Sequence, residues 1–298
     1  MPLKVKTTIE IPGAADSAFD HGAFDPKTRR LFVAHTARDT LDVIDHDGGK
    51  HIATLSGFKE AAGVVADNGH VLVTNRGAAS LTWLDGETFK TRAVFDTAPR
   101  PNGAALVERL HLAVVACIGD DTHRPELQTL NLQDSQRWSL KLPGRPRWCV
   151  TNAAGTRLFL AIREPSMVLT ARLPELTDVE HWLLPSGGGH GIDIDHRRRR
   201  LYVACDDGAL VELETDSGKV TNQWPLGGVP DATFFNPASS LVHVAIGNPG
   251  VVQTIDPRTG ERSDLATARG AHTTALAQPD QLYVFSPVHR GALVLDQA

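Results

Sequence analysis

A short apolar run recurs along the chain at intervals of about forty residues. Its seven copies are rich in β-branched and aromatic residues and have the length of a strand: Leu31–His35, Val71–Asn75, Ala113–Cys117, Leu158–Ile162, Leu201–Cys205, Val242–Ile246 and Leu282–Ser286. The last residues of successive copies are 40, 42, 45, 43, 41 and 40 positions apart. Repetition at this period indicates that one structural unit is used seven times.

Each unit contains further short strands around this run. A polar turn such as NAAGTR at 152–157 usually precedes the run, and a second apolar run follows it and ends in a hairpin turn such as ETDSGK at 214–219. A third run lies before each copy and starts near a glycine in most units. Three or four short strands in every forty residues, without helical periodicity, predict the blades of a β-propeller.

The two ends of the chain favour a closed ring. Residues Lys4–Ile11 alternate like an outer strand, whereas the last unit stops at Ala292–Asp296 without an outer strand of its own. The first segment can complete the last blade and remove an open sheet edge. The sequence therefore predicts an all-β chain, with residues 1–298 forming a single seven-bladed β-propeller domain closed by the N-terminal strand.

Equivalent positions of the innermost strands supply the candidate site. Aligning the units on the recurring run gives one residue in each blade: His21, Ala62, Asn102, Trp148, His190, Asp231 and His272. His190, Asp231, His272 and His21 come from consecutive blades and are expected to project toward one axis. Imidazole and carboxylate groups bind divalent metals, so these four residues are the predicted ligands of zinc, iron, manganese, nickel or copper.

The other candidates surround this predicted centre. Asp231 is either a fourth ligand, a catalytic base or the cap of a loop, and Asn102 and Arg147 are candidate catalytic residues that hold an anionic or carbonyl group. Trp148, Glu60 and His289 are candidate substrate contacts. His35 ends the second strand of its blade, where it is either a metal ligand, a proton shuttle or a hydrogen-bond donor to a ligand at the rim, or a half-buried residue that donates to a loop carbonyl.

Composition narrows the possible partners. A net charge of -5 with interspersed signs and only 17 aromatic residues argue against nucleic acid and anionic lipid as partners. No apolar stretch is long enough for a transmembrane helix, and the first residues do not read as a signal peptide. Three cysteines without CxxC spacing suit a reducing compartment, so a cytoplasmic protein is expected. The expected partner is a small-molecule substrate bound at the predicted site. Nothing in the sequence indicates its oligomeric state.

The repeat resembles that of the YVTN family, the seven-bladed propellers that include the YncE-like proteins. The resemblance rests on the runs at Leu201–Cys205, Leu31–His35 and Val71–Asn75 and on the Asp-Pro turns at Asp25 and Asp256. It implies the fold for the whole chain, but members differ widely in function.

Two hypotheses for function follow. The first is a metal-dependent propeller enzyme, a hydrolase or lyase, because the His-Gly starts at His21 and His190 look like those of streptogramin lyase and the ring distantly resembles lactonase-type propellers. The lyase's Trp-Phe-Thr-Glu strand is absent, and the acidic and Asn metal ligands of the lactonases do not match this His-rich ring. The alternative is a non-enzymatic YncE-like scaffold that binds a ligand or a protein, with the histidines exposed to water.

Overall fold

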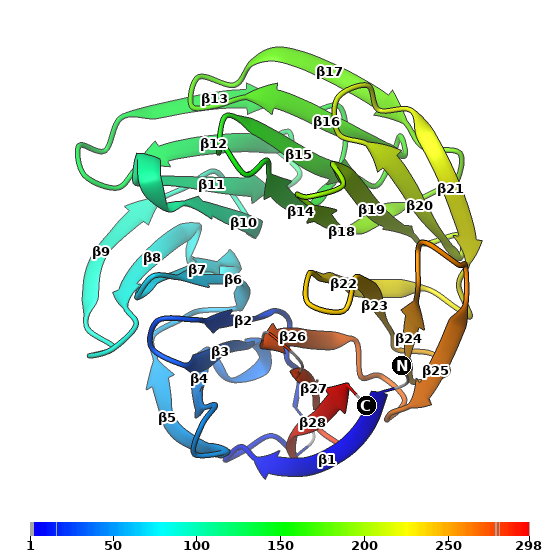
Figure 1. The fold of residues 1–298 in the computed structure, drawn as a ribbon. Helices are drawn as coiled ribbons and strands as arrows, with labels where there is room; N and C mark the ends of the chain where they lie inside the picture. The colour runs from blue at the N-terminus through cyan, green and yellow to red at the C-terminus, as the bar shows by residue number, and fades with distance from the viewer. Residues whose placement is uncertain (1–2, 16, 278, 280, 298) are drawn as a thin grey trace.

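The computed structural model describes residues 3–15, 17–277, 279 and 281–297, which form a ring of seven four-stranded antiparallel sheets (Figure 1). This confirms the predicted all-β, seven-bladed propeller. The described residues also include the 3-10 helices η1 (Thr36–Arg38), η2 (Arg76–Ala78) and η3 (Glu108–Leu110). None of the helices in the described part of the chain is long and apolar enough to cross a membrane.

Blades 1 to 6 each use four consecutive strands, numbered from the axis outward. Blades 1 to 3 contain β2 (Gly22–Asp25), β3 (Arg30–His35), β4 (Thr40–Asp45), β5 (Lys50–Ser56); β6 (Ala61–Asp67), β7 (His70–Asn75), β8 (Ser80–Asp85), β9 (Thr91–Asp96); and β10 (Pro101–Val107), β11 (Leu112–Cys117), β12 (Glu126–Asn131), β13 (Arg137–Lys141). Blades 4 to 6 contain β14 (Pro146–Thr151), β15 (Arg157–Ile162), β16 (Met167–Arg172), β17 (Thr177–Leu183); β18 (Gly189–Asp195), β19 (Arg200–Cys205), β20 (Ala209–Glu214), β21 (Val220–Pro225); and β22 (Pro230–Asn236), β23 (Leu241–Ile246), β24 (Val251–Ile255), β25 (Arg262–Ala266).

Blade 7 joins the two ends of the chain. It contains β26 (Thr273–Ala277), β27 (Gln281–Ser286), β28 (Gly291–Gln297) and, as its outer strand, β1 (Leu3–Glu10). Strand β1 runs antiparallel to β28, with Leu3 opposite Gln297 and Glu10 opposite Gly291. Figure 1 shows the two strands side by side at the rim of the ring. The predicted closure is confirmed, and it leaves neither end strand without a partner in the sheet.

The hydrophobic core lies between neighbouring blades. The recurring apolar run forms the second strand of every blade, and its five residues are buried in each copy. One cluster joins Phe24 and Leu31 of blade 1 to Tyr283 and Phe285 of blade 7, and other clusters join other adjacent blades. Outer strands such as β5 alternate between exposed and partly buried positions. Each blade therefore buries its apolar faces only when its neighbours are present.

Candidate functional site

A β-bulge disturbs the inner strand near its beginning in blades 2 to 6. In blade 2, Ala61 pairs with Asn75 but Val64 pairs with Val73, so three steps along β6 match two along β7. The same shift occurs in blades 3, 4, 5 and 6. A bulge leaves a residue unpaired and changes the direction of nearby side chains. In these five inner strands it places two consecutive residues outside the regular ladder at one end of the ring, called here the entry face.

The first of these two residues, together with its counterparts in blades 1 and 7, forms the entry layer. Asp20 is the counterpart in blade 1 because Ala34 of the second strand bonds to both Asp20 and His21. His272 is the counterpart in blade 7, since the next residue, Thr273, pairs with Phe285. Six of the seven members are polar: Asp20, Ala62, Asn102, Arg147, His190, Asp231 and His272.

The residues that follow form a second layer. They are His21, Gly63, Gly103, Trp148, Gly191, Ala232 and Thr273. The alignment made from sequence is thus one residue out in blades 1 and 4, because it placed His21 and Trp148 with the entry layer. Glycine is required at several positions, since a Cβ on Gly63 would lie 2.1 Å from the carbonyl oxygen of Asn102. The small residues bring neighbouring inner strands into close contact.

His21 and Trp148 stack on one another from blades that face each other across the ring. Their ring centroids are 3.9 Å apart, and His21 Nδ1 donates a hydrogen bond to the carbonyl oxygen of Val64 at 2.9 Å. Burial lowers the pKa of His21, so the ring is neutral at pH 7. A cavity of about 350 Å³ begins at His21 and is lined by the later residues of the inner strands, among them Asp193 and Phe234. The stacked pair therefore lies between the entry layer and this cavity.

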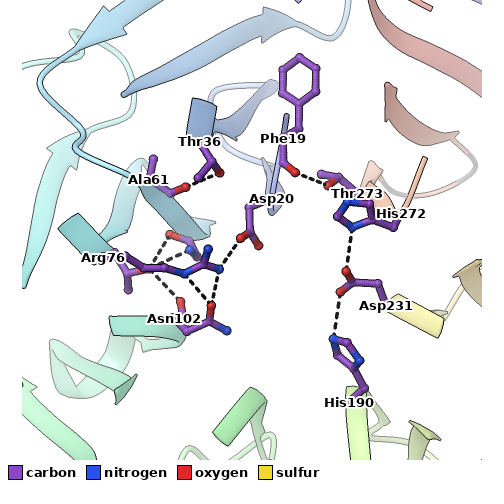
Figure 2. A network of polar contacts seen from close by, with 12 residues as sticks. Phe19, Asp20, Thr36, Ala61, Arg76, Asn102, His190, Asp231, His272 and Thr273 are labelled. Atoms are coloured by element: carbon purple, nitrogen blue, oxygen red, sulfur yellow. Dashed lines mark hydrogen bonds and ion pairs between the residues drawn. The ribbon is translucent and has the colours of Figure 1, made fainter. Parts of the chain in front are cut away.

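Four side chains from blades 5, 6 and 7 form a continuous chain of hydrogen bonds and ion pairs on the entry face. His190 Nδ1 is 2.7 Å from Asp206 Oδ1, and its Nε2 is 3.3 Å from Asp231 Oδ1. The other oxygen of Asp231, Oδ2, lies 2.8 Å from His272 Nδ1 (Figure 2). The exposed fraction of the side chains rises from 8% at His190 to 30% at Asp231 and 44% at His272. The chain therefore has a buried end and an end open to solvent.

The charges in this chain stabilise one another. Burial opposes ionisation of His190, but hydrogen bonds to Asp206 and Asp231 outweigh it and raise the pKa of the imidazole. The hydrogen bond to Asp231 is the largest influence on His272 and raises its pKa, with a further contribution from the charge of Asp20. Burial also opposes ionisation of Asp231, yet the two imidazoles hold its pKa well below the usual range. Asp231 is therefore a carboxylate at neutral pH.

His272 is oriented for proton transfer by this carboxylate. Its Nδ1 donates to Asp231, and its Nε2 has no hydrogen-bond partner within residues 3–15, 17–277, 279 and 281–297. An imidazole fixed at Nδ1 by a carboxylate keeps the tautomer in which Nε2 accepts a proton. The arrangement is that of a general base or, once protonated, a general acid.

A second network faces this chain from blades 1, 2 and 3. Arg76 Nε donates to Asn102 Oδ1 at 3.0 Å, and another nitrogen of the same guanidinium pairs with Asp20 (Figure 2). Asn102 is 3% exposed, and because its Oδ1 accepts from Arg76, its Nδ2 is oriented away from the guanidinium as a donor. Asn102 lies in the entry layer, as the alignment predicted, whereas in blade 4 the layer contains Arg147 instead of the predicted Trp148. The catalytic roles of Asn102 and Arg147 stay predictions.

His35 lies inside blade 1 rather than at the rim. Its Nε2 is 2.6 Å from Ser17 Oγ, its Nδ1 is 2.7 Å from Asp42 Oδ2, and its ring stacks on Phe19 at 4.3 Å. These contacts have the order of a catalytic triad, but His35 has no exposed surface. A base without an exposed atom cannot pass a proton to a leaving group, so this network stabilises the blade. The predicted catalytic role of His35 at the rim is not supported by this position.

Two other candidate residues, Glu60 and His289, lie outside the entry layer and the second layer. Glu60 is exposed just before β6, where its backbone nitrogen donates to Asp39 Oδ1 and its carbonyl oxygen accepts from the backbone of Arg76. His289 lies in the turn between β27 and β28, with a buried Nε2 that has no hydrogen-bond partner in the described part of the chain. Roles for these two residues, and for Trp148, in binding a substrate stay predictions.

The sequence reasoning missed several charged residues of the site. Arg76, Arg163 and Asp206 each come directly after the last residue of a recurring run, at the end of a second strand. Asp20 was missed because the blade 1 alignment was one residue out. The signal was present in the repeat, since three of the seven residues that follow the run are charged.

The predicted metal ligands do not converge on one point. His21 belongs to the second layer, and His190 and His272 each direct a ring nitrogen at Asp231 rather than at a shared centre. Within the described residues there is no group of three or more His, Cys, Asp or Glu positioned to hold a metal ion. The donor set in this arrangement fits a hydrogen-bonded chain.

Comparisons with known proteins bear on the fold. No protein-family model matches the chain, and no curated protein matches it. Solved structures similar to it include hydrazine synthase of Kuenenia stuttgartiensis, with a TM-score of 0.82 and 13% identity over 97% of this chain and 99% of that chain. A streptogramin B lyase structure has a TM-score of 0.83 and 10% identity over 99% of this chain and 97% of that chain. At these identities the likeness concerns the propeller fold alone, and membership of the YVTN family stays a prediction.

Proposed function

We propose that the protein is a propeller enzyme, a lyase or hydrolase, that performs acid–base chemistry on a small organic molecule at the entry face. The observation that carries the proposal is the chain Asp206–His190–Asp231–His272, which ends in a half-exposed imidazole with a free Nε2. Pairs of titratable groups with shifted pKa values are characteristic of catalytic sites. Two of the similar solved structures are enzymes by name, which agrees with this proposal.

His272, Asp231 and His190 have different roles in the proposed proton transfer. His272 Nε2 takes a proton, either from water that attacks a carbonyl carbon or from a carbon next to a carbonyl group. Asp231 stabilises the imidazolium that forms, and His190 keeps Asp231 ionised and in place. The proton then passes from His272 to the leaving oxygen. The first route gives a lactonase-like hydrolase and the second gives a lyase.

The divalent metal ion predicted from the sequence stays a prediction. To bind it, His190 and His272 have to release Asp231, which holds both rings in the structure. Elemental analysis of protein purified without a histidine tag tests this requirement. Stoichiometric zinc, iron, manganese, nickel or copper that disappears in a His190→Ala, His272→Ala variant supports the metal. Absence of metal, with no rise in Tm when these ions are added, contradicts it.

A panel of lactones, linear esters and streptogramin B tests the reaction class by mass spectrometry. A hydrolase adds the mass of one water to its substrate, whereas ring opening by elimination leaves the mass unchanged. We expect turnover by the native chain and a loss of about 10²–10⁴-fold in His272→Gln, the range of a general base. His181→Gln is the matched control, since His181 is exposed on β17.

Two results contradict the proposal. If His272→Gln turns over a substrate at the rate of His181→Gln, then His272 is not the base. If the protein binds a labelled compound of the panel but converts no compound of the panel into a product, the alternative of a YncE-like binding scaffold is favoured.

A further inference from the structure

Five arginines from blades 2, 3 and 4 gather on the entry face, where they meet the His–Asp chain at Asp206. Arg76 begins η2 in blade 2, Arg100 precedes β10 in blade 3, and Arg145, Arg147 and Arg163 lie at the corresponding ends of β14 and β15 in blade 4. The backbone nitrogen of Arg163 donates to the carbonyl oxygen of Arg145 at 2.9 Å, which joins two of these positions directly. Arg147 belongs to the entry layer, where the bulge in β14 places it.

Three of the five guanidinium groups have no carboxylate within ion-pair distance among the described residues. Arg76 forms an ion pair with Asp20, and Arg163 Nε is 2.8 Å from Asp206 Oδ2. The carboxylate of Asp206 is also hydrogen-bonded to His190. Arg100, Arg145 and Arg147 make no ion pair with any carboxylate of the described chain. Three guanidinium groups are thus unpaired at one place in a protein whose net charge is -5.

Arg147 combines a buried side-chain nitrogen with a lowered pKa. Its Nε is buried and has no hydrogen-bond partner among the described residues. Burial lowers its pKa and the charge of Arg145 lowers it further, and together these outweigh the opposite effect of the carboxylates of Asp231 and Asp206. Burial likewise lowers the pKa of Arg145, followed by the charges of Arg163, Arg100 and Arg76. Arg145 and Arg147 are therefore close enough to neighbouring guanidinium groups to be destabilised by them, and a bound anion relieves this repulsion.

We propose that this cluster binds a small molecule with at least two anionic oxygen groups, carboxylates or phosphates, of which one lies against Arg145 and Arg147. The planar guanidinium matches both kinds of oxyanion, and Nδ2 of Asn102 is a further donor beside them. In a ring of seven, blade 4 lies opposite blades 7 and 1, so the ligand extends across the axis toward His272 (Figure 1). This names the substrate class of the proposed enzyme and in that sense rests on the proposed function.

Isothermal titration calorimetry in a low-salt buffer free of phosphate tests the binding. The probes are citrate for carboxylates, pyrophosphate for phosphates, and triethyl citrate as the uncharged analogue of the first. We expect at least one anion to bind, the neutral ester not to bind, and affinity to fall as salt is added. Arg147→Gln and Arg145→Gln are each expected to weaken binding at least tenfold.

Arg172→Gln is the matched control, because Arg172 is exposed on β16 of the same blade and its nearest carboxylate, in Asp178, is 3.8 Å away. The inference is wrong if neither anion binds, or if Arg172→Gln loses as much affinity as the other two variants. Arg145 is exposed, so Arg145→Gln carries the test if Arg147→Gln does not fold.

The same variants separate this inference from the proposed reaction. His272→Gln is expected to keep the anion affinity of the native chain while losing turnover. If it keeps both, the catalytic proposal fails and the anion site stands. If turnover is lost in His272→Gln but no anion binds to the native chain, the anion site fails and the catalytic proposal stands.

Discussion

The Nδ1 atom of His272 lies 2.8 Å from Oδ2 of Asp231, although the two residues belong to different blades and are 41 positions apart in the sequence. Neighbouring blades are separate sheets, so this contact arises where their inner strands approach the axis. The site is therefore shared among blades, and blades 5, 6 and 7 supply His190, Asp231 and His272, whose ionisation depends on the neighbouring blade. Most of the properties that can be tested follow from this sharing.

Replacing Asp231 with Asn is expected to lower the pKa of both His190 and His272, because the carboxylate that raises them is lost. The pKa of His272 lies above its ordinary value of 6.5 in the native chain. Since the base acts when deprotonated, kcat/KM rises with pH through this pKa, and the rise moves to lower pH in Asp231→Asn. NMR titration of the imidazole protons measures both shifts without a substrate. Unchanged titration of His272 contradicts the assignment.

Gly103→Ala tests the close approach of inner strands. A Cβ at this position would lie 2.2 Å from the carbonyl oxygen of Arg147, which is part of the neighbouring inner strand and cannot move aside alone. We expect the free energy of unfolding to fall by about 1–3 kcal/mol, as in other overpacked sites. Gly247→Ala is the control, because its nearest atom would be 3.4 Å away. Equal stability of the two variants in urea would show that the strands are further apart.

The carboxyl group of Asp193 is expected to make the free energy of unfolding depend on pH. Burial raises the pKa of this carboxyl group to about 7, even though the backbone nitrogens of Phe235 and Ile194 donate to it. The folded chain then holds a proton that the unfolded chain has released, so stability decreases as pH rises from about 4 through 7. Asp193→Asn removes this decrease, which is on the order of a few kcal/mol. Urea unfolding at a series of pH values measures it, with the exposed Asp178→Asn as control.

Asp42→Asn tests the network inside blade 1. Asp42 has no exposed surface and accepts from His35 at 2.7 Å, from His51 at 3.0 Å and from Thr54. Loss of the carboxylate leaves these donors without a charged acceptor, so we expect destabilisation of about 3 kcal/mol. Ser17→Ala removes only the outer hydrogen bond to His35 and should cost about 1 kcal/mol. A larger effect of Ser17→Ala than of Asp42→Asn on Tm would contradict this interpretation.

The candidate site was predicted from the sequence in part. His190, Asp231, His272 and Asn102 occupy the entry layer, as the repeat indicated, whereas in blade 4 the repeat indicated Trp148 and the layer contains Arg147. The pairing of His190 with Asp206 could not be predicted, because it joins the beginning of one strand to the end of another through the geometry of the bulge. The stacked pair His21 and Trp148 was missed for a related reason. A shift of one residue in a strand moves a side chain to another layer, and the apolar pattern of the inner strands is too short to fix the register.

The architecture follows from the repeat in the amino-acid sequence. A run of buried strand-forming residues returning every forty positions can bury its apolar faces only by packing against copies of itself, and seven copies with a spare first strand close a ring. Which polar residues come into contact depends on how the blades pack in three dimensions. Contacts such as those between Arg76 and Asp20, 56 positions apart, depend on the bulges and on how neighbouring inner strands converge at the axis. Periodicity specifies strands, whereas the direction of each side chain at their ends depends on local backbone geometry that the periodicity does not encode.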